Sequence, residues 1–314
     1  MDTDHALRTS PKHDHRTQLL KLEKMRRGGF WFRRWSFVDM ATFCWIMSIH
    51  VLAAWSPFVF DWGGFIVSMG LVLLTETDMT IGYHRLLTHR SFKVPKWLEY
   101  TFAYCGVLSG QKDPISWVSI HKKHHKYAET DRDPHSPTEG FWFSHIGWFC
   151  YNNYIVAKCG DYTNVPELKA QWFYRFLHNT YFWHPTALAM LLYIYGGFAY
   201  LAWGVGIQTV IVCHITFVVR SVGHVWGERS WNTPDNSTNN WWSGVLALGE
   251  GWHNNHHAFP NLARHGLERW QFDLAWEIIK FLELIGLATD VKQPTEADKT
   301  RMLALLAPNK LKLI

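Results

Sequence analysis

The sequence has few cysteines, and they are not arranged in pairs. Five are present, which is an odd number, and none lies in a CxxC motif. A disulfide framework and a zinc ribbon are therefore not indicated, because both need cysteines in sets. The sequence also contains no glycine-rich dinucleotide fingerprint, no HPGG-bearing cytochrome b5 domain and no cysteine set for an iron–sulfur cluster. If the protein carries out redox chemistry, we expect its electrons to come from a separate protein.

The N-terminal region lacks the apolar core of a secretory signal peptide, and its aspartates make it a poor transit peptide. We therefore expect no organelle import signal. Residues 1–35 hold nine Lys or Arg and four Asp or Glu, a surplus equal to the net charge of +5 of the whole chain. A basic arm before an apolar segment is typical of the cytosolic side of a first membrane span. No fold signature of nucleic-acid binding accompanies the arm, so we expect no nucleic-acid partner.

Tryptophan, in contrast to cysteine, is abundant. The chain has 19 Trp among 314 residues, and 48% of its residues are hydrophobic. Trp and Tyr concentrate where an apolar protein surface meets the headgroup layer of a membrane. The mean hydropathy of −0.14 is nevertheless too polar for a protein made only of spans. We therefore expect a membrane part together with a large water-facing part.

Four segments have about the 20 residues that a transmembrane helix needs, namely 36–55, 65–83, 181–203 and 206–226. The connections within each pair, residues 56–64 and the few residues around Gly204, contain no Lys or Arg, whereas the other connecting segments are rich in them. The positive-inside rule then places both termini and the two long connecting segments, residues 84–180 and 227–314, in the cytoplasm. We expect an all-α integral membrane protein in which residues 36–288 form one domain with two helical hairpins. A tail, residues 289–314, follows.

Eight of the 19 histidines fall into three tight clusters. The clusters are His84 with His89, His121 with His124 and His125, and His253 with His256 and His257. Positions i, i+3 and i+4 share one face of a helix, so each HxxHH motif is expected to aim its imidazoles at one point. Eight such ligands are too many for one ion of about four to six ligands, which indicates two metals. Zinc cannot change its oxidation state, whereas iron with imidazole ligands and open positions suits O₂ activation.

With these motifs the chain resembles the membrane fatty-acyl desaturases, especially the stearoyl-CoA (delta-9) desaturase-like group of plants, algae, cyanobacteria and animals. The resemblance runs from about Phe65 to Val291. Outside the clusters it is carried by Asp131-Arg-Asp-Pro-His135, Gly140-Phe-Trp-Phe-Ser-His145, Arg264-His-Gly-Leu-Glu268 and Gly286-Leu-Ala-Thr-Asp290. It implies four transmembrane helices with a cytosolic helical cap, and two iron ions held by nine histidines, with O₂ as co-substrate. The ninth histidine, from the fourth span, is His224.

One position departs from the family pattern. The group usually has Asn four residues before the ninth histidine, where it holds a metal-bound water, and this chain has Arg220. A guanidinium cannot accept a hydrogen bond from water. Either Arg220 pairs with a carboxylate, for which Glu76 and Asp78 are candidates, or the site is tuned differently. The alternative is that Glu76 and Asp78 simply lie at the end of the span that faces water.

Other residues are expected to support the metals and the substrate. Asp131, Asp133 and His135 are expected to orient ligand imidazoles through the ring nitrogen that does not face the metal. An unactivated methylene has to be positioned beside the metals in a long apolar tunnel, and that position decides which carbon reacts. The resemblance implies that Gln111, Trp117 and Thr216 line the bend of this tunnel; ordinary helix packing is the alternative.

The resemblance implies a desaturase that inserts a cis double bond, of the delta-9 type, into a saturated acyl chain. A lipid hydroxylase on the same histidine scaffold is the alternative, and a non-catalytic metal carrier is a rival of another class. Animal acyl-CoA members carry charged residues just before the second cluster, where this chain has Ser119 and Ile120. This difference weakens the case for an acyl-CoA substrate and leaves glycerolipid-bound acyl chains open.

The electron donor and the membrane follow from the resemblance in the same way. It implies cytochrome b5 with its reductase for a member in the endoplasmic reticulum, and ferredoxin for one in a plastid or cyanobacterial membrane. The terminal Lys310-Leu-Lys312-Leu-Ile resembles a dilysine retrieval signal. We therefore expect the endoplasmic reticulum, with the active site and both termini in the cytosol, and a plastid or cyanobacterial membrane as the alternative.

Overall fold

The computed structural model describes residues 35–304. Across these residues the secondary structure is helical, and extended pairing is limited to isolated bridges, such as Lys93 with Thr289. The expected all-α class is confirmed. Nearly all of the basic arm and the terminal Lys310-Leu-Lys312 lie outside the described residues.

Two long apolar helices open the described part of the chain. Helix α3, Phe37–Trp55, continues into the 3-10 helix η1, Ser56–Val59, and helix α4, Trp62–Thr77, continues into the π-helix η2, Asp78–Thr88. A capping box starts α3, because the Ser36 hydroxyl accepts a hydrogen bond from the Asp39 N–H and the Asp39 carboxylate accepts one from the Ser36 N–H. The Asp61 carboxylate starts α4 by accepting a hydrogen bond from the Gly64 N–H.

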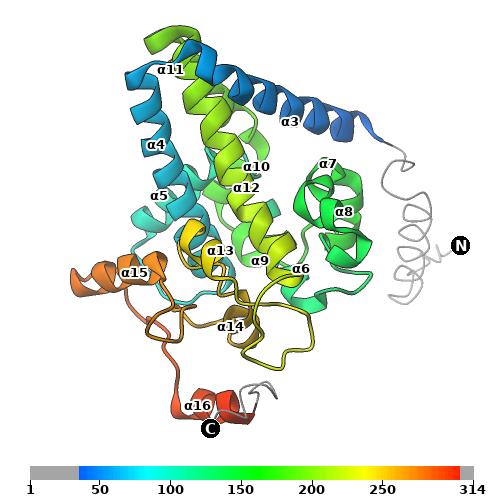
Figure 1. Ribbon diagram of the computed structural model, residues 1–314, viewed down its shortest axis with the longest axis vertical. Coiled ribbons are helices and arrows are strands. Elements are labelled where there is room, and N and C mark those ends of the chain that lie inside the picture. Colours follow the sequence, from blue (N-terminus) through cyan, green and yellow to red (C-terminus); the bar gives the residue numbers. More distant parts are fainter. Residues whose placement is uncertain (1–34, 305–314) are drawn as a thin grey trace, which may run out of the picture.

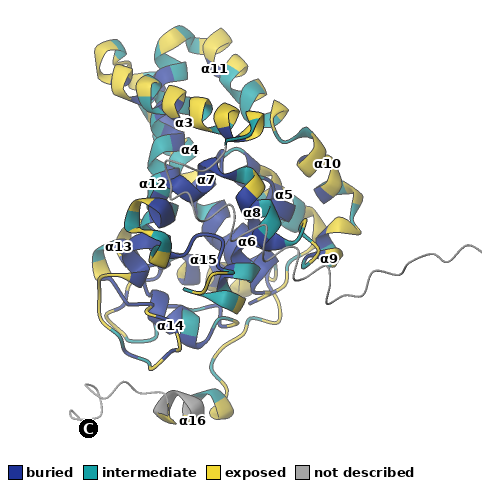
Figure 2. Ribbon diagram, turned by 90° about the vertical axis from the view of Figure 1, so that its right-hand side faces the viewer, coloured by how far each residue is buried: buried dark blue, intermediate teal, exposed yellow. Residues whose placement is uncertain are grey.

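A third apolar segment lies later in the chain. It consists of α11, Trp183–Leu201, the π-helix η5, Ala202–Ile207, α12, Gln208–Ser221, and the 3-10 helix η6, Val222–His224. Phe37–Val59, Trp62–Thr88 and Trp183–His224 are each long and apolar enough to cross a membrane. Figure 2 shows α3 and α11 largely exposed, and their outward side chains include Phe37, Ile194 and Tyr195, which are 76–88% exposed. Such apolar faces need lipid around them. The protein is therefore an integral membrane protein.

The third segment reverses direction at a glycine pair. Gly196 (φ −139°, ψ 16°) and Gly197 (φ 65°, ψ −153°) leave the helical conformation. A methyl group added at Gly204 would lie 2.8 Å from Leu192 Cδ1, whereas an unbroken helix would separate these residues by about 18 Å at 1.5 Å per residue. The chain therefore folds back at Gly196–Gly197. The expected break near Gly204 was wrong, because Gly204 and Gly206 instead allow close helix packing: a methyl at Gly206 would lie 2.8 Å from the Ala53 backbone nitrogen.

The remaining helices form an extramembrane region, meaning the described residues outside the three apolar segments. Between the second and third apolar segments these are α5 (Lys96–Val107), α6 (Pro114–Tyr127), η3 (Pro137–Glu139), η4 (Phe143–Gly147), α7 (Trp148–Cys150), α8 (Asn152–Cys159), α9 (Pro166–Lys169) and α10 (Trp172–Thr180). After the third they are α13 (Trp241–Leu246), α14 (His253–Ala258), α15 (Leu274–Leu284) and α16 (Glu296–Ala304). In Figure 1, α4 and α12 descend side by side toward α13 and α14. The C-terminal ends of the second and third apolar segments thus lie next to this region.

A buried arginine ties the end of the second apolar segment to the C-terminal part of the extramembrane region. Arg85, in η2, is fully buried, and its Nε lies 3.0 Å from Glu250 Oε1. Its Nη2 lies 2.9 Å from Asp273 Oδ1, and its Nη1 donates to the Ala263 carbonyl at 2.7 Å. A guanidinium can satisfy several acceptors at once, which makes it suited to a buried junction. Arg85 thereby fixes the chain around Glu250 against the end of the second apolar segment.

Candidate metal centre

Four stretches of the chain supply the clustered histidines. His84 lies in η2 and His89 caps its C-terminus, His121, His124 and His125 lie in α6, His224 ends η6, and His253, His256 and His257 lie in α14. Helix α6 starts at Asp113, whose carboxylate accepts hydrogen bonds from the Ile115 and Ser116 N–H groups, with Pro114 as its first residue. This fixed N-terminus determines the direction in which each histidine points around the axis of α6.

The nine histidines expected to bind metal converge in two groups. The first group is His84, His89, His121, His125 and His256, and the second group is His124, His224, His253 and His257. Within each group, one ring nitrogen from every member lies within 4.8 Å of the others. Imidazole nitrogens about 2.1 Å from a shared ion lie roughly 3–4 Å apart. Each group therefore has close to the spacing that one ion needs.

Each HxxHH motif is divided between the two groups, so the expectation that its imidazoles meet at one point was wrong. In α6, His121 and His125 join the first group and His124 joins the second. In α14, His253 and His257 join the second group and His256 the first. Residues i and i+4 are about 40° apart around a helix, whereas i+3 and i+4 are about 100° apart. Adjacent histidines therefore diverge and serve neighbouring sites.

The nitrogens of the first group face one another in a way that favours a bound cation. His84 Nδ1 lies 2.6 Å from Glu250 Oε2, and a carboxylate at this place favours the tautomer with the proton on Nδ1 and a lone pair on Nε2. His256 Nε2 lies 3.1 Å from His84 Nε2 and 2.9 Å from His125 Nε2. One N–H cannot point along both contacts, and a lone pair on His256 would face the lone pair of His84. A metal ion among these nitrogens removes the conflict, so the donor set fits one.

Carboxylates hold the outer nitrogen of four of the nine histidines. The pairs are His84 Nδ1 with Glu250 Oε2 (2.6 Å), His124 Nδ1 with Asp133 Oδ2 (3.0 Å), His224 Nδ1 with Glu129 Oε1 (2.9 Å) and His257 Nδ1 with Asp235 Oδ2 (2.9 Å). Such a partner fixes the tautomer and orientation of a metal-binding imidazole and raises its basicity. The sequence indicated Asp133 for this position. It did not indicate Glu129, Asp235 or Glu250, although Glu250 stands only three residues before His253.

The charges of these carboxylates persist because of the histidines around them. Burial alone would raise the pKa of Asp133, but His124 nearby holds that pKa below its usual range. The same balance lowers the pKa of Asp235 through His257, and that of Glu250 through His84, His265 and Arg85. Burial also lowers the pKa of histidines in both groups, including His121 and His253, and brings that of His257 to about 4. Neutral imidazoles are the form that binds metal.

The remaining residues expected to orient the imidazoles take different places. His135 is fully buried, and its ring lies 4.3 Å from that of His124, centroid to centroid. Its Nδ1 is 3.8 Å from Asp133 Oδ1, which is beyond hydrogen-bond distance. Asp131 is exposed and belongs to neither group.

Arg220 lies beside the centre without an ion pair among the described residues. Its guanidinium carbon is 4.5 Å from the ring centroid of Trp148 and 5.4 Å from that of Trp117. The expected pairing with Glu76 or Asp78 is therefore not found, because two aromatic faces take up the cation instead. Arg220 is only 4% exposed, and both of its Nη atoms are without a hydrogen-bond partner.

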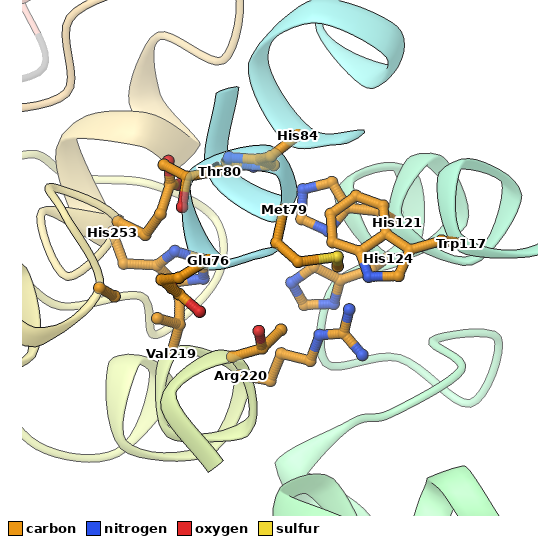
Figure 3. A pocket seen from close by; sticks show the side chains of 13 residues that line it. Glu76, Met79, Thr80, His84, Trp117, His121, His124, Val219, Arg220 and His253 are labelled. Atoms are coloured by element: carbon orange, nitrogen blue, oxygen red, sulfur yellow. Dashed lines mark ion pairs between the residues drawn. The ribbon is translucent and has the colours of Figure 1, made fainter. Parts of the chain in front are cut away.

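A cavity of about 40 Å³ opens onto both groups of histidines. Its lining includes His84 and His121 of the first group, His124 and His253 of the second, and also Glu76, Met79 and Arg220 (Figure 3). Of the expected tunnel residues, Trp117 and Thr216 line this cavity. Gln111 does not, but its Nε2 donates to Thr216 Oγ1 at 3.0 Å and so holds that side chain from behind.

A tenth histidine, which the sequence did not single out as a ligand, stands next to the first group. His265 Nδ1 lies 3.2 Å from Glu250 Oε2, and its ring centroid is 4.4 Å from that of His256. His84, Glu250 and His265 together form a further set of close donor atoms. The signal for this residue was its place in the Arg264-His-Gly-Leu-Glu268 motif.

Comparisons with known proteins agree with this geometry. Residues 61–280 match the family model described as fatty acid desaturase. The chain is 51% identical over 282 residues to the chloroplastic palmitoyl-monogalactosyldiacylglycerol delta-7 desaturase of Arabidopsis thaliana, covering 90% of this chain and 76% of the relative. It is 50% identical over 280 residues to delta-9 acyl-lipid desaturase 2 of Arabidopsis thaliana, covering 89% and 91%.

A third relative carries a name with a different acyl carrier. The icosanoyl-CoA 5-desaturase of Limnanthes douglasii is 49% identical over 300 residues, covering 94% of this chain and 84% of the relative. The family match extends over most of the chain and includes every histidine of the two groups. The chain therefore belongs to the fatty acid desaturase family and is a fatty-acyl desaturase, an oxidoreductase.

Proposed function

We propose that the protein inserts a cis double bond into a saturated acyl chain with O₂, using two iron ions held by the nine histidines. The observation that carries this proposal is the convergence of the histidines into one group of five and one of four, both opening onto one cavity. The iron pair would supply the oxidant, derived from O₂, that removes hydrogen from an unactivated methylene. Asp133, Glu129, Asp235 and Glu250 would keep the imidazoles oriented.

The substrate that we propose is an acyl chain on a membrane glycerolipid, with the double bond at the delta-9 position. Relatives named delta-9 acyl-lipid desaturases support both parts. Ser119, in the place where acyl-CoA members carry charge, is buried and bonded to Asn164, so it is not offered to a head group. Acyl-CoA is the alternative carrier, which the icosanoyl-CoA relative favours.

For topology, we propose four crossings in two hairpins, with the histidine-bearing region and both termini in the cytosol. The reversal at Gly196–Gly197 supports two crossings within Trp183–His224. Two electrons per turnover would come from cytochrome b5 with its reductase in the endoplasmic reticulum. The alternative is ferredoxin in a plastid membrane, which the chloroplastic relative favours.

Expression in a desaturase-deficient yeast tests the activity. Gas chromatography with mass spectrometry of total acyl groups should show new monounsaturated chains in cells that make the wild-type protein. His256→Ala, which removes a member of the first group, should abolish the product and lower the iron content. His184→Ala, in α11 and outside both groups, is the matched control and should retain product and iron.

Two outcomes would contradict the proposal. Hydroxylated chains without new double bonds would assign the scaffold to the lipid hydroxylase alternative. Purified wild-type protein that contains iron in trace amounts only would show that the histidines do not hold a resident iron pair.

A further inference from the structure

A second cavity lies on a different face of α12 from the metal cavity. It has a volume of about 290 Å³, and its lining includes Ile211, Ile215 and Val218 of α12 together with Leu246 and Ala247 at the end of α13. The metal cavity instead meets α12 at Thr216, Val219 and Arg220. The two cavities therefore lie against neighbouring faces of the helix. Ala247 lines both of them.

The lining of this lateral groove, as we name the second cavity, is apolar. It contains no Lys, Arg, Asp or Glu, and its two polar members are His214 and Ser243. Both ring nitrogens of His214 are engaged, since Nε2 lies 2.9 Å from His50 Nε2 and Nδ1 lies 3.0 Å from His145 Nε2. A phosphate or coenzyme A head group would find no charged partner there. The groove suits a hydrocarbon chain.

The surface around the lateral groove points to the bilayer. Helix α12 belongs to an apolar segment of membrane-spanning length, and α13 lies beside its lower part (Figure 1). The outer face of α13 presents Trp241, Val245 and Leu246, which are 48–66% exposed, and Trp226 nearby is 57% exposed. Tryptophans with aliphatic neighbours are typical of a membrane interface. The groove therefore opens at the level where a lipid tail begins.

We propose that the lateral groove admits the acyl chain of a bilayer lipid sideways from the membrane, past Ala247, into the metal cavity. This inference rests on the proposed desaturase function and narrows its substrate to chains that are anchored in the bilayer. Ala247, the C-cap residue of α13, lies at both cavities. Its side chain is a single methyl group, so little side-chain volume separates the two cavities there. A chain delivered on soluble acyl-CoA would instead need a cationic mouth, which the groove lining lacks.

Filling the groove tests the route. Ile215→Trp places a large side chain in the groove, on the face of α12 that does not line the metal cavity. Membranes of desaturase-deficient yeast that contain the protein would receive a deuterated saturated phospholipid or, in parallel with acyltransferases inhibited, deuterated saturated acyl-CoA. We expect the rate on the phospholipid-linked chain to fall at least about tenfold, an increase of roughly 1.4 kcal/mol in the barrier. Iron content should stay at the wild-type level, because Ile215 belongs to neither histidine group and does not line the metal cavity.

Leu73→Trp is the matched control, because Leu73 lies in apolar α4, is 58% exposed and does not line the groove. It should keep the wild-type rate. If Ile215→Trp does not accumulate, Leu246→Trp takes its place, because Leu246 lies at the exposed rim of the groove. We expect Leu246→Trp to slow the phospholipid-linked reaction as well.

The outcomes separate the route from the function. Ile215→Trp and Leu246→Trp that turn over the phospholipid-linked chain at the wild-type rate would overturn the lateral route. Wild-type protein that acts on acyl-CoA alone would overturn the lateral route and leave the desaturase function in place. Wild-type protein that acts on neither carrier would overturn the function itself.

Discussion

At the scale of single residues, the proposed metal centre would depend on carboxylates as much as on imidazoles. Asp133 accepts from His124 Nδ1 at 3.0 Å and also accepts backbone hydrogen bonds from Glu129 and His135. It is fully buried, so its charge is held in one place by these donors. An amide in its place would keep the volume but lose the charge that makes His124 a strong ligand.

We therefore expect Asp133→Asn to weaken metal binding without unfolding the protein. Loss of a carboxylate partner behind a metal-binding histidine typically costs about 10- to 100-fold in affinity. Iron per protein after purification and dialysis against a weak chelator would be measured by elemental analysis. Asp131→Asn is the control, because Asp131 is exposed and belongs to neither group, and it should keep its iron. Full iron occupancy in Asp133→Asn would remove the role assigned to this carboxylate.

Clustering in the sequence singled out eight of the nine histidines and the family resemblance added His224, but most of their carboxylate partners had no such signal. Repeated spacing of i, i+3 and i+4 marks His121, His124 and His125 without any knowledge of the fold. Asp235 meets His257 and Glu129 meets His224 only because loops distant in the sequence pack together. No local pattern distinguishes such a carboxylate from a solvated one.

At the scale of the elements, the hairpin within Trp183–His224 depends on Gly197. Its φ of 65° with ψ of −153° is a conformation open essentially to glycine alone. Apolar residues run through the turn from Leu191 to Leu201, so hydropathy does not show where the chain reverses. The Gly196–Gly197 pair was the available turn signal. Length-based division placed the break at Gly204, since that choice gives two segments of spanning length.

Gly197→Ala should destabilise the protein by about 1–3 kcal/mol, the usual cost of holding a residue with a Cβ in a forbidden backbone region. A methyl at this position meets no neighbouring atom within 4 Å, so the effect would come from the backbone conformation alone. Thermal unfolding in detergent, followed by circular dichroism, would measure it. Gly70→Ala is the matched control: Gly70 lies inside α4, a methyl there also meets open space, and helix propensity should leave the variant as stable as wild type or more so. Equal melting temperatures for Gly197→Ala and wild type would contradict the hairpin geometry.

At the scale of the whole molecule, the two groups of histidines form only when the second and third apolar segments and the extramembrane region are in place together. The first group takes histidines from η2, α6 and α14, and the second from α6, η6 and α14. The sequence allowed the prediction that the clusters lie on one side of the membrane, since that follows from charge and span count. It did not reveal how each HxxHH motif divides, because the division depends on the angle at which α6 and α14 approach each other.

This gathering of buried histidines gives the metal-free protein a defined response to pH. The pKa of His257 is about 4, and burial holds those of His121, His125, His253 and His256 below their ordinary range. In the unfolded chain each would take up a proton near pH 6.5. Between about pH 6.5 and 4 the unfolded state therefore binds more protons, and the free energy of unfolding falls as the pH is lowered.

We expect the melting temperature of the iron-free protein to be constant from about pH 8 to 7 and to fall steadily below about pH 6.5. His257→Gln, which removes one depressed group, should make this fall shallower, whereas His184→Gln, outside both groups, should alter it less. Iron binds the neutral imidazoles, so loading the protein with iron should raise the melting temperature at pH 7 and lose this advantage as acid displaces the metal. A melting temperature that stays level down to pH 5 in the iron-free protein would mean that the folded histidines take up protons as readily as the unfolded ones, which would contradict the lowering of their pKa by burial.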